Sequence, residues 1–175
     1  MPIDESREFI PLCMVILTIS DSRTRATDRS GPLLVDLAQE AGHSVLDAMI
    51  VPDDKTAIIR ELRRCIEDPE IQVVLATGGT GITGRDVSPE AFSSVYEKEI
   101  PGFGELFRWI SYAKIGSSTI QSRATAGVAG GTLLFALPGS TGACKDAWDE
   151  ILRWQLDARF RPCNFAELLP RLQED

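Results

Sequence analysis

The sequence predicts an α/β fold in which a mostly parallel sheet lies between two layers of helices. Runs of buried-strand character alternate along the chain with amphipathic, helix-like segments, and short polar breaks separate them. The runs Leu12–Ile19 and Thr132–Leu137 are almost continuously apolar, as expected for strands that are covered on both faces. Since parallel strands need crossover connections, this alternation predicts a three-layer α/β/α sandwich.

Local signals place the individual elements. The expected strands are four apolar and β-branched runs, at 12–19, 44–51, 71–77 and 132–137. The expected helices lie at about 30–41, at 54–66, from 88 onward, at 103–112 and at 141–156. Pro32 stands in the first turn of the first helix, and Asp53 and Asp54 suit the N-cap of the second. Residues 88–90 (SPE) combine a capping hydroxyl, a first-turn proline and an acid near the positive end of the dipole. The tail after the last helix is expected to be mostly irregular, with one short helical turn.

Size and charge exclude several classes of protein. At 175 residues, the chain is expected to form one domain. Its net charge of −8 and pI of about 4.7 argue against nucleic acid or an anionic membrane as partners, because both attract cationic proteins. The N-terminus lacks the basic start and apolar stretch of a signal peptide, and the longest apolar run is far short of a membrane span. A phosphate-bearing ligand would therefore be small and held locally.

Histidine and cysteine usage narrows the chemistry further. The single histidine, His43, excludes a multi-histidine metal site and argues against a histidine-based triad, so we expect it to be structural. The four cysteines form no C-x-x-C pair, and Cys13 and Cys65 lie inside apolar patterns. Buried free thiols in a reducing cytoplasm are therefore expected.

The glycine-rich stretch after the third expected strand matches two nucleotide-binding patterns in part. Residues 79–84 (GTGITG) fit the dinucleotide pattern G-x-G-x-x-G, but the helix start comes only at Ser88 and no ribose-binding acid follows at the required distance. The same glycines begin a P-loop, but Arg85 and Asp86 stand where a lysine and a hydroxyl residue belong. We therefore reject both motifs.

The stretch still has the properties of an anion cradle. A strand, a glycine turn and a helix present several backbone N–H groups with no side chains in the way, and Thr77 and Thr80 add hydroxyls. Because Asp86 would repel a phosphate, a divalent cation such as Mg²⁺ is expected between them. The alternative is that the glycines form only a tight turn and that Asp86 faces water.

Other loops are expected beside the glycine turn, because ligands of parallel sheets bind at the carboxyl ends of the strands. Asp53 in the VPDD turn is the second candidate carboxylate, although its alternative role is part of a helix cap. Capping is also the alternative role of Ser140 or Thr141. The candidate ligand-binding residues are Ser20, Asp21, Thr77, Gly78, Gly79, Thr80, Gly81, Arg85, Pro138, Gly139, Ser140 and Thr141, and the candidate catalytic and metal-binding residues are Asp53 and Asp86.

The motifs and their order resemble the MoaB/MogA family of molybdenum cofactor biosynthesis proteins. The shared features are ISDS after the first strand, the VPDD turn, TGGTGITGRDVSPEA, EIPGFGELFR, SRATAGV and LFALPGS. The ending LDARFRPCNF resembles the MoaB branch. The resemblance covers the chain from about Val15 to Asn164, and it implies one domain spanning 1–175 with a core at about 12–164.

The resemblance implies a molybdopterin adenylyltransferase, in which the phosphate of the pterin attacks the α-phosphorus of ATP and pyrophosphate leaves. The functional aspartates of the family fall on Asp53 and Asp86, and its glycine loop falls on Gly78, Gly79 and Gly81. Mg²⁺ is then the expected cofactor, ATP and molybdopterin are the substrates, and other molybdenum cofactor biosynthesis proteins are candidate partners. The alternatives are a non-catalytic molybdopterin-binding or assembly protein and a phosphohydrolase.

The resemblance also implies a homo-oligomer, because the family assembles as trimers that are often paired into hexamers in the MoaB branch. The aromatic-rich segment Phe103–Tyr112 supports this expectation, since it carries more apolar surface than one small domain easily buries.

Overall fold

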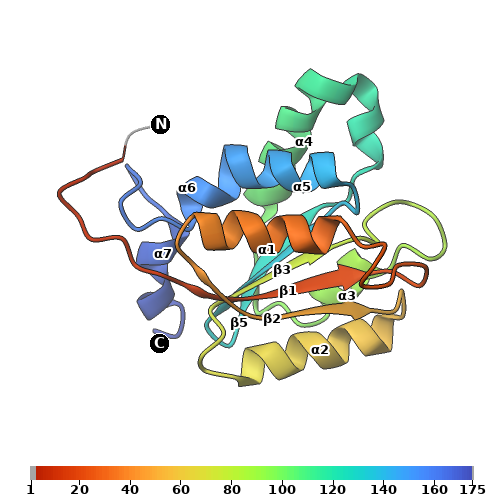
Figure 1. Ribbon diagram of the computed structural model, residues 1–175, viewed down its shortest axis with the longest axis horizontal. Coiled ribbons are helices and arrows are strands. Elements are labelled where there is room, and N and C mark those ends of the chain that lie inside the picture. Colours follow the sequence, from red (N-terminus) through yellow and green to blue (C-terminus); the bar gives the residue numbers. More distant parts are fainter. Residues whose placement is uncertain (1–2, 175) are drawn as a thin grey trace.

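The computed structural model describes residues 3–174 and contains a six-stranded sheet with helices on both faces (Figure 1). The strand order is β2-β1-β3-β6-β5-β4. The first four of these strands are parallel, whereas β5 and β4 are antiparallel to their neighbours. This arrangement confirms the predicted three-layer α/β fold with a mostly parallel sheet. No helix within residues 3–174 is long and apolar enough to cross a membrane.

The elements occur in the expected order. The strands are β1 Cys13–Ile19, β2 Ser44–Val51, β3 Val73–Thr77, β4 Lys98–Glu99, β5 Thr125–Ala129 and β6 Thr132–Leu137. The helices are α1 Ser30–Glu40, α2 Lys55–Glu67, α3 Ser88–Ser93, α4 Pro101–Ile115, α5 Thr141–Ala147, α6 Arg153–Gln155 and α7 Phe165–Leu168, with 3-10 turns at Gly116–Gln121 and Leu169–Arg171. A π-helical turn, Trp148–Leu152, joins α5 to α6, so the single helix expected at 141–156 is present with a local widening.

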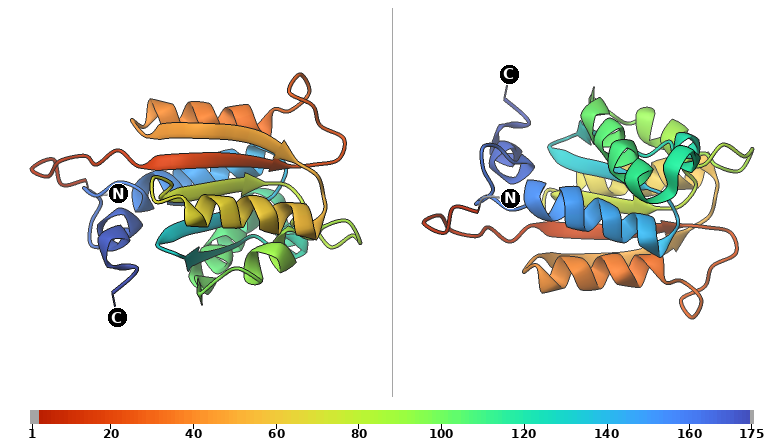
Figure 2. Two further views of the ribbon diagram at one scale, coloured as in Figure 1. Left: turned by 90° about the horizontal axis from the view of Figure 1, so that it is seen from below. Right: turned by 90° about the horizontal axis from the view of Figure 1, so that it is seen from above.

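The sheet separates two hydrophobic cores. Helices α1, α4 and α5 cover one face, and α2 and α3 cover the other (Figure 2). Met14 and Ile16 of β1 pack into the first core, whereas Val15 and Leu17 pack into the second. Because successive side chains of a strand point to opposite faces, a strand between two helical layers must be apolar at every position. This explains the continuous apolar run that predicted β1.

The sequence analysis did not predict β4 and β5. The two glycines between β5 and β6, Gly130 and Gly131, both have positive φ (56° and 85°), which is the conformation that a tight hairpin requires. β5 then runs antiparallel to β6, and the two-residue β4 pairs with its outer edge. A glycine pair between two strand-like runs is the signal that could have revealed this hairpin.

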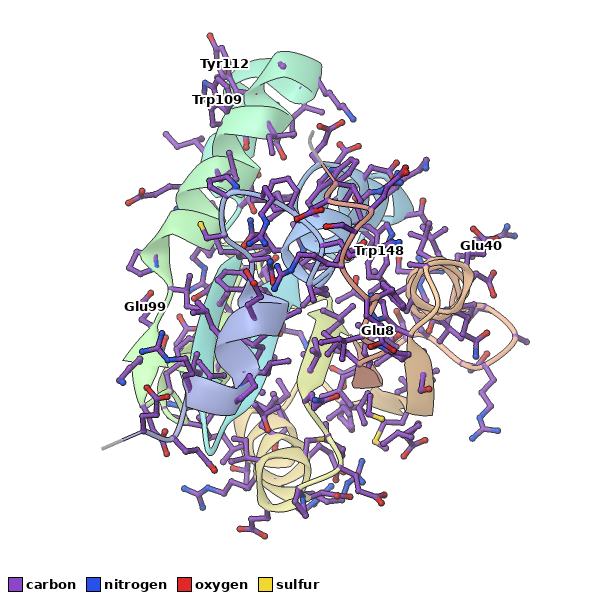
Figure 3. The ribbon with its side chains drawn as sticks, turned by 90° about the vertical axis from the view of Figure 1, so that its left-hand side faces the viewer. Glu8, Glu40, Glu99, Trp109, Tyr112 and Trp148 are labelled. Carbon is purple, nitrogen blue, oxygen red and sulfur yellow. The ribbon has the colours of Figure 1, made fainter. Side chains whose placement is uncertain are left out.

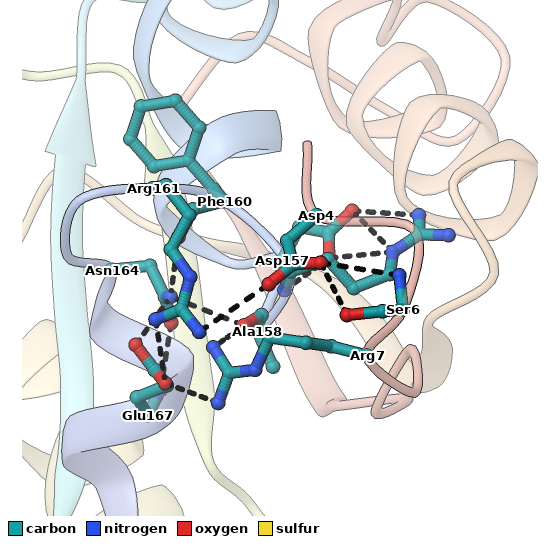
Figure 4. Close-up of polar contacts among 10 residues, drawn as sticks. Asp4, Ser6, Arg7, Asp157, Ala158, Phe160, Arg161, Asn164 and Glu167 are labelled. Atoms are coloured by element: carbon teal, nitrogen blue, oxygen red, sulfur yellow. Dashed lines mark hydrogen bonds and ion pairs between the residues drawn. The ribbon is translucent and has the colours of Figure 1, made fainter. Parts of the chain in front are cut away.

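The C-terminal tail is fixed by a polar network rather than by regular structure (Figure 4). Asn164 is buried, accepts a hydrogen bond from the N–H of Glu167 (2.8 Å) and donates to the carbonyl of Phe160 (3.0 Å). Arg7, near the N-terminus, donates to the carbonyl of Ala158 (2.6 Å) and forms an ion pair with Glu167. The tail is therefore irregular, as expected, with α7 as its short helical turn.

His43 has a structural role. Its side chain is buried, its Nδ1 accepts a hydrogen bond from the N–H of Leu12 (3.2 Å), and its ring packs near Phe9 and Trp148. Burial lowers the pKa of His43 from 6.5 to about 4, although the nearby Asp157 carboxylate opposes this shift. The imidazole is therefore neutral in the folded protein at pH 7.

Acidification should destabilise the protein through His43. Between about pH 6.5 and pH 4 the unfolded chain binds a proton at this histidine and the folded chain does not, so the free energy of unfolding falls as pH falls. The contribution of this residue is up to about 3 kcal/mol. Urea unfolding at pH 7 and pH 4.5 should show a larger loss for the wild type than for His43→Gln, and equal losses would contradict the assignment.

Candidate functional site

A hollow of about 890 Å³, here called the main hollow, lies at the carboxyl ends of β1, β3 and β6. This is the edge at which parallel α/β sheets bind ligands. Its lining comes from the loops that follow four strands and from the start of α1. The lining residues are Thr18, Ile19, Ser20, Asp21, Ser22, Arg23, Asp28, Arg29, Ser30, Asp53, Thr77, Gly78, Gly79, Arg85, Asp86, Gly139, Ser140 and Thr141.

Strand register brings these loops to one level. Ile19 of β1 pairs with Val51 of β2, and Thr77 of β3 lies between Thr18 and Leu137 of its neighbours. All four parallel strands therefore end at the same edge of the sheet, and each following loop starts from a fixed point. Short loops after the strands are therefore enough to bring residues that are far apart in the sequence to one site.

Close packing requires glycine at two positions of the loop that follows β3. Gly78 has φ +111°, and a Cβ at this position would overlap the backbone carbonyl oxygen of Ile19. Gly79 has φ +64°, and a Cβ there would overlap the hydroxyl oxygen of Ser88. That hydroxyl donates to the carbonyl of Gly78 (2.7 Å), so the start of α3 is tied directly to the turn. Only glycine satisfies both the backbone conformation and the space at these positions.

Asp21 and Asp53 exchange hydrogen bonds between the loops that follow β1 and β2. The N–H of Asp21 donates to the Asp53 carboxylate (3.0 Å), and the N–H of Asp53 donates to the Asp21 carboxylate (3.1 Å). Arg85 forms an ion pair with Asp21 across the same edge. The pKa of Asp53 is raised, first by partial burial and then by the charge of Asp86. Asp53 and Asp86 therefore lie close enough to influence one another electrostatically.

Asp86 is held in a different way. Its carboxylate accepts hydrogen bonds from the N–H (2.8 Å) and the hydroxyl (2.6 Å) of Thr83. Partial burial opposes ionisation of Asp86, but these hydrogen bonds and the charge of Arg123 outweigh it and lower its pKa. The Asp86 carboxylate is thus ionised and oriented at neutral pH.

The two carboxylates do not form a complete metal site by themselves. Among residues 3–174, no group of three or more His, Cys, Asp or Glu side chains is placed to hold a metal ion. Mg²⁺ usually binds to proteins through one or two carboxylates and completes its octahedron with water and substrate phosphates. Asp53 and Asp86 beside the glycine turn fit that incomplete type of site.

The structure brings most of the predicted site residues together. Ser20, Asp21, Asp53, Thr77, Gly78, Gly79, Arg85, Asp86, Gly139, Ser140 and Thr141 all line the main hollow. The other three, Thr80, Gly81 and Pro138, line a neighbouring cavity of about 420 Å³, here called the side hollow. The two hollows share Gly79, Asp86, Gly139 and Ser140.

Ser140 and Thr77 also have structural bonds. The hydroxyl of Ser140 accepts from the N–H of Ala143 (3.2 Å) and caps α5, which is the alternative role considered above. The hydroxyl of Thr77 donates to the carbonyl of Pro138 (2.9 Å) and lies 3.1 Å from the sulfur of Cys144. Thr77 therefore joins the ends of β3 and β6, and its one hydroxyl proton is already donated.

The candidate site residues chosen from the sequence did not include those of the polar loop before α1, whose role the sequence left open. Arg23, Asp28 and Arg29 line the main hollow. Asp28 accepts from the Thr18 hydroxyl (2.7 Å) and from the N–H groups of Ser30 (3.1 Å) and Gly31 (3.2 Å), so it binds the first N–H groups of α1 and fixes the loop to β1. An acid two residues before a helix start is the signal that could have placed Asp28.

Comparison with known proteins agrees with this geometry. Residues 15–158 match the family described as "Probable molybdopterin binding domain". The crystal structure of tungsten cofactor synthesizing protein MoaB from Pyrococcus furiosus is similar at a TM-score of 0.73 and 35% identity, covering 81% of this chain and 91% of that one. The chain belongs to the MoaB/MogA family.

Other members of the MoaB/MogA family are more similar still. Molybdenum cofactor biosynthesis protein B of Escherichia coli (strain K12) is 53% identical over 160 residues, which cover 91% of this chain and 94% of that protein. A crystal structure of a molybdenum cofactor biosynthesis protein B has a TM-score of 0.87 at 42% identity and covers 97% of this chain and 100% of that one. The resemblance inferred from the motifs is therefore confirmed across nearly the whole chain.

The close packing at Gly78 predicts a sharp difference between two glycine substitutions. Gly78→Ala should lower the free energy of unfolding by on the order of 3 kcal/mol or more, because alanine is strained at this φ and meets the Ile19 carbonyl. Gly84→Ala is the matched control in the same loop, since its Cβ would meet open space and its φ is not positive. The control should change stability by less than about 1 kcal/mol. Urea unfolding measures both, and similar values would refute the packing argument.

Proposed function

We propose that this protein transfers AMP from ATP to molybdopterin, releasing pyrophosphate, ahead of molybdate insertion in molybdenum cofactor biosynthesis. The observation that carries the proposal is the meeting of Asp53 and Asp86, from separate loops, beside the glycine turn at the main hollow. The chain belongs to a family described as a probable molybdopterin binding domain, which supports the pterin as the acceptor. A relative named for molybdenum cofactor biosynthesis supports the pathway.

The reaction needs little covalent participation by the protein. An oxygen of the pterin phosphate forms a new bond to the α-phosphorus of ATP, and the bond from that phosphorus to the bridging oxygen of the β-phosphate breaks. The electron pair leaves with pyrophosphate. A phosphate monoester is already an anionic nucleophile at neutral pH, so no general base is required. Rate enhancement then comes from alignment and from neutralising the charge of the leaving group.

Each part of the main hollow has a role in this scheme. The backbone N–H groups of Gly79 and Thr80 bind phosphate oxygens, as glycine turns do in other nucleotide sites. The N–H of Gly78, expected to join them, instead donates to the carbonyl of Leu137 (2.9 Å), and that of Gly81 bonds to Asp86. Asp53 and Asp86 hold Mg²⁺, which when bound neutralises charge on the departing pyrophosphate. Ser140 and Thr141 contact the pterin or its phosphate. The volume of about 890 Å³ is within the range of roughly 300–1,000 Å³ that is usual for ligand pockets.

One assay separates this proposal from its alternatives. The protein is incubated with ATP, MgCl₂ and molybdopterin, and the products are separated by chromatography. Adenylylated molybdopterin with an equal amount of pyrophosphate supports the transferase. Bound but unchanged pterin indicates a non-catalytic binding or assembly protein, and ADP or AMP without adenylylated pterin indicates a phosphohydrolase. We place the reaction in the cytoplasm, because all four cysteines are free thiols.

Asp86→Asn tests the proposed metal-binding role. Asparagine keeps the size of the side chain and one oxygen, but it removes the charge that holds Mg²⁺. We expect turnover to fall by on the order of a hundredfold or more, the scale seen when one transition-state charge contact is lost. Affinity for molybdopterin should change little, since other loops supply its contacts.

Asp54→Asn is the matched control for this test. It makes the same change of charge one residue from Asp53, and asparagine can still accept the capping bond from Ala57. Transfer by the control should stay within about threefold of the wild type, because surface charge changes have small effects. Near-normal transfer by Asp86→Asn would show that Asp86 is only a solvated loop residue without a role in metal binding. Loss of folding would show that its role is to stabilise the loop.

We also propose that the protein is a homotrimer or a homohexamer. Helix α4 and the 3-10 turn after it expose large apolar side chains, with Trp109 74%, Tyr112 62% and Ile120 82% exposed. Figure 3 shows Trp109 and Tyr112 projecting from the far end of α4, away from the body of the molecule, whereas Trp148 lies within it. Clustered exposed apolar residues of this kind mark protein interfaces.

Light scattering at micromolar concentration should give a mass of at least three subunits. Trp109→Glu should reduce the mass, because it places a charge within the exposed apolar surface. Leu168→Glu on α7, a partly exposed leucine on a different element, is the control and should leave the mass unchanged. A monomeric wild type would rule out the proposed assembly.

A further inference from the structure

Arg123, just before β5, contacts the glycine loop from outside both hollows. It does not line the main hollow or the side hollow. Its backbone N–H donates to the carbonyl of Thr80 (2.9 Å), which fixes the start of the loop. Its guanidinium then reaches along the loop, and each of its three nitrogens has a protein acceptor.

The guanidinium bonds bracket the exposed part of the loop. Nε donates to the carbonyl of Gly81 (2.6 Å), Nη2 donates to the carbonyl of Asp86 (2.6 Å), and Nη1 forms an ion pair with Glu90 on α3. Residues 82–85, between the two carbonyls, are exposed and add no side chain to either hydrophobic core. These residues have no buried side chain to anchor them, so the bonds from Arg123 to the two carbonyls hold this part of the loop against the protein.

This contact bears directly on the orientation of Asp86. The main chain of Asp86 is held by Arg123, while its carboxylate is held by the N–H and hydroxyl of Thr83. Asp86 is thus held at its main chain and at its carboxylate, and it lines the same hollow as Asp53. A looser main chain would leave the distance between the two carboxylates undefined.

We propose that Arg123 is a positioning residue that closes the loop 81–86 and sets the Asp86 carboxylate beside Asp53. It acts through the loop, because each of its three guanidinium nitrogens is bonded to a protein acceptor and its side chain lines neither hollow. This inference rests on the proposed function only in that Asp53 and Asp86 together bind Mg²⁺ and the nucleotide. Lysine cannot replace arginine here, since an ammonium group cannot reach two carbonyls and a carboxylate in the same planar arrangement.

The test compares Arg123→Lys with two matched variants. Arg108→Lys makes the same substitution at a neighbouring arginine, which donates to the carbonyls of Ser122 (3.5 Å) and Ala124 (3.3 Å) but not to the loop. Glu90→Gln removes the ion pair and leaves both carbonyl bonds of Arg123 in place. If the carbonyl bonds carry the effect, Glu90→Gln should resemble the wild type.

For Arg123→Lys we expect a split between the kinetic constants. kcat for adenylyl transfer should fall by on the order of tenfold to a hundredfold, as misplacement of a catalytic group does. The Mg²⁺ concentration for half-maximal rate should rise by about tenfold, which is typical when a residue that orients a metal ligand is lost. KM for molybdopterin should stay within about twofold, and hydrogen exchange should become faster at the amides of residues 80–87 and not elsewhere. Arg108→Lys and Glu90→Gln should show none of these changes.

Several results would overturn the inference. Unchanged exchange in the loop would mean that Arg123 does not close it, and faster exchange with unchanged kcat and Mg²⁺ dependence would make its role purely structural. A higher KM for molybdopterin at constant kcat would indicate direct substrate contact. Global unfolding of Arg123→Lys would assign the residue to overall stability instead.

The inference can be separated from the proposed function. If the wild type makes no adenylylated pterin, the transferase proposal fails, and calorimetry of ATP binding with Mg²⁺ becomes the decisive measurement. Weaker binding in Arg123→Lys than in Arg108→Lys would still support positioning of Asp86. Equal binding in the two variants, or no Mg²⁺-dependent binding by the wild type, would overturn it.

Discussion

The close approach of Gly78 to the end of β1 is the constraint on which the whole site depends. The backbone of Gly78 lies against the carbonyl of Ile19, and its N–H donates to the carbonyl of Leu137 (2.9 Å). One residue without a side chain thus joins the ends of β1, β3 and β6. Because β2 pairs with β1, the Asp53 loop is carried to the same place. The hollow is a consequence of how tightly the strand ends meet, and the loops around it start from points that the backbone fixes.

Much of the fold, and the location of the site, could be predicted from local sequence. Buried parallel strands must be apolar on both faces, and capping residues mark the helix starts, so β1, β2, β3 and β6 were found within one or two residues. The site followed from topology, since loops at the carboxyl ends of parallel strands share one edge. Asp53 and Asp86 could be brought together on that ground alone, before any side-chain geometry was known.

What could not be predicted depends on contacts between distant segments. β5 (TAGVA) is short and built of small residues, and the ring of Tyr96 packs on Gly127 where a side chain would otherwise stand. Such a strand is specified by its neighbours and not by its own pattern. Since β5 was not predicted, Arg123 could not be placed beside the glycine loop. The polar loop containing Arg23 and Arg29 could be given no role from the sequence, because Asp28 fixes it through a bond to Thr18 in β1.

The polar network of the tail also determines where the chain ends lie. Ile3 pairs with Phe160, and Gln173 donates to the carbonyl of Gly130 (2.7 Å) at the turn between β5 and β6. Both described ends, residues 3 and 174, are therefore at the edge of the sheet opposite the main hollow (Figure 1). An affinity tag or a further domain joined at either end would extend away from the ligand-binding edge. The module can accordingly be immobilised or fused through its ends while the opposite edge stays open to small molecules from solution.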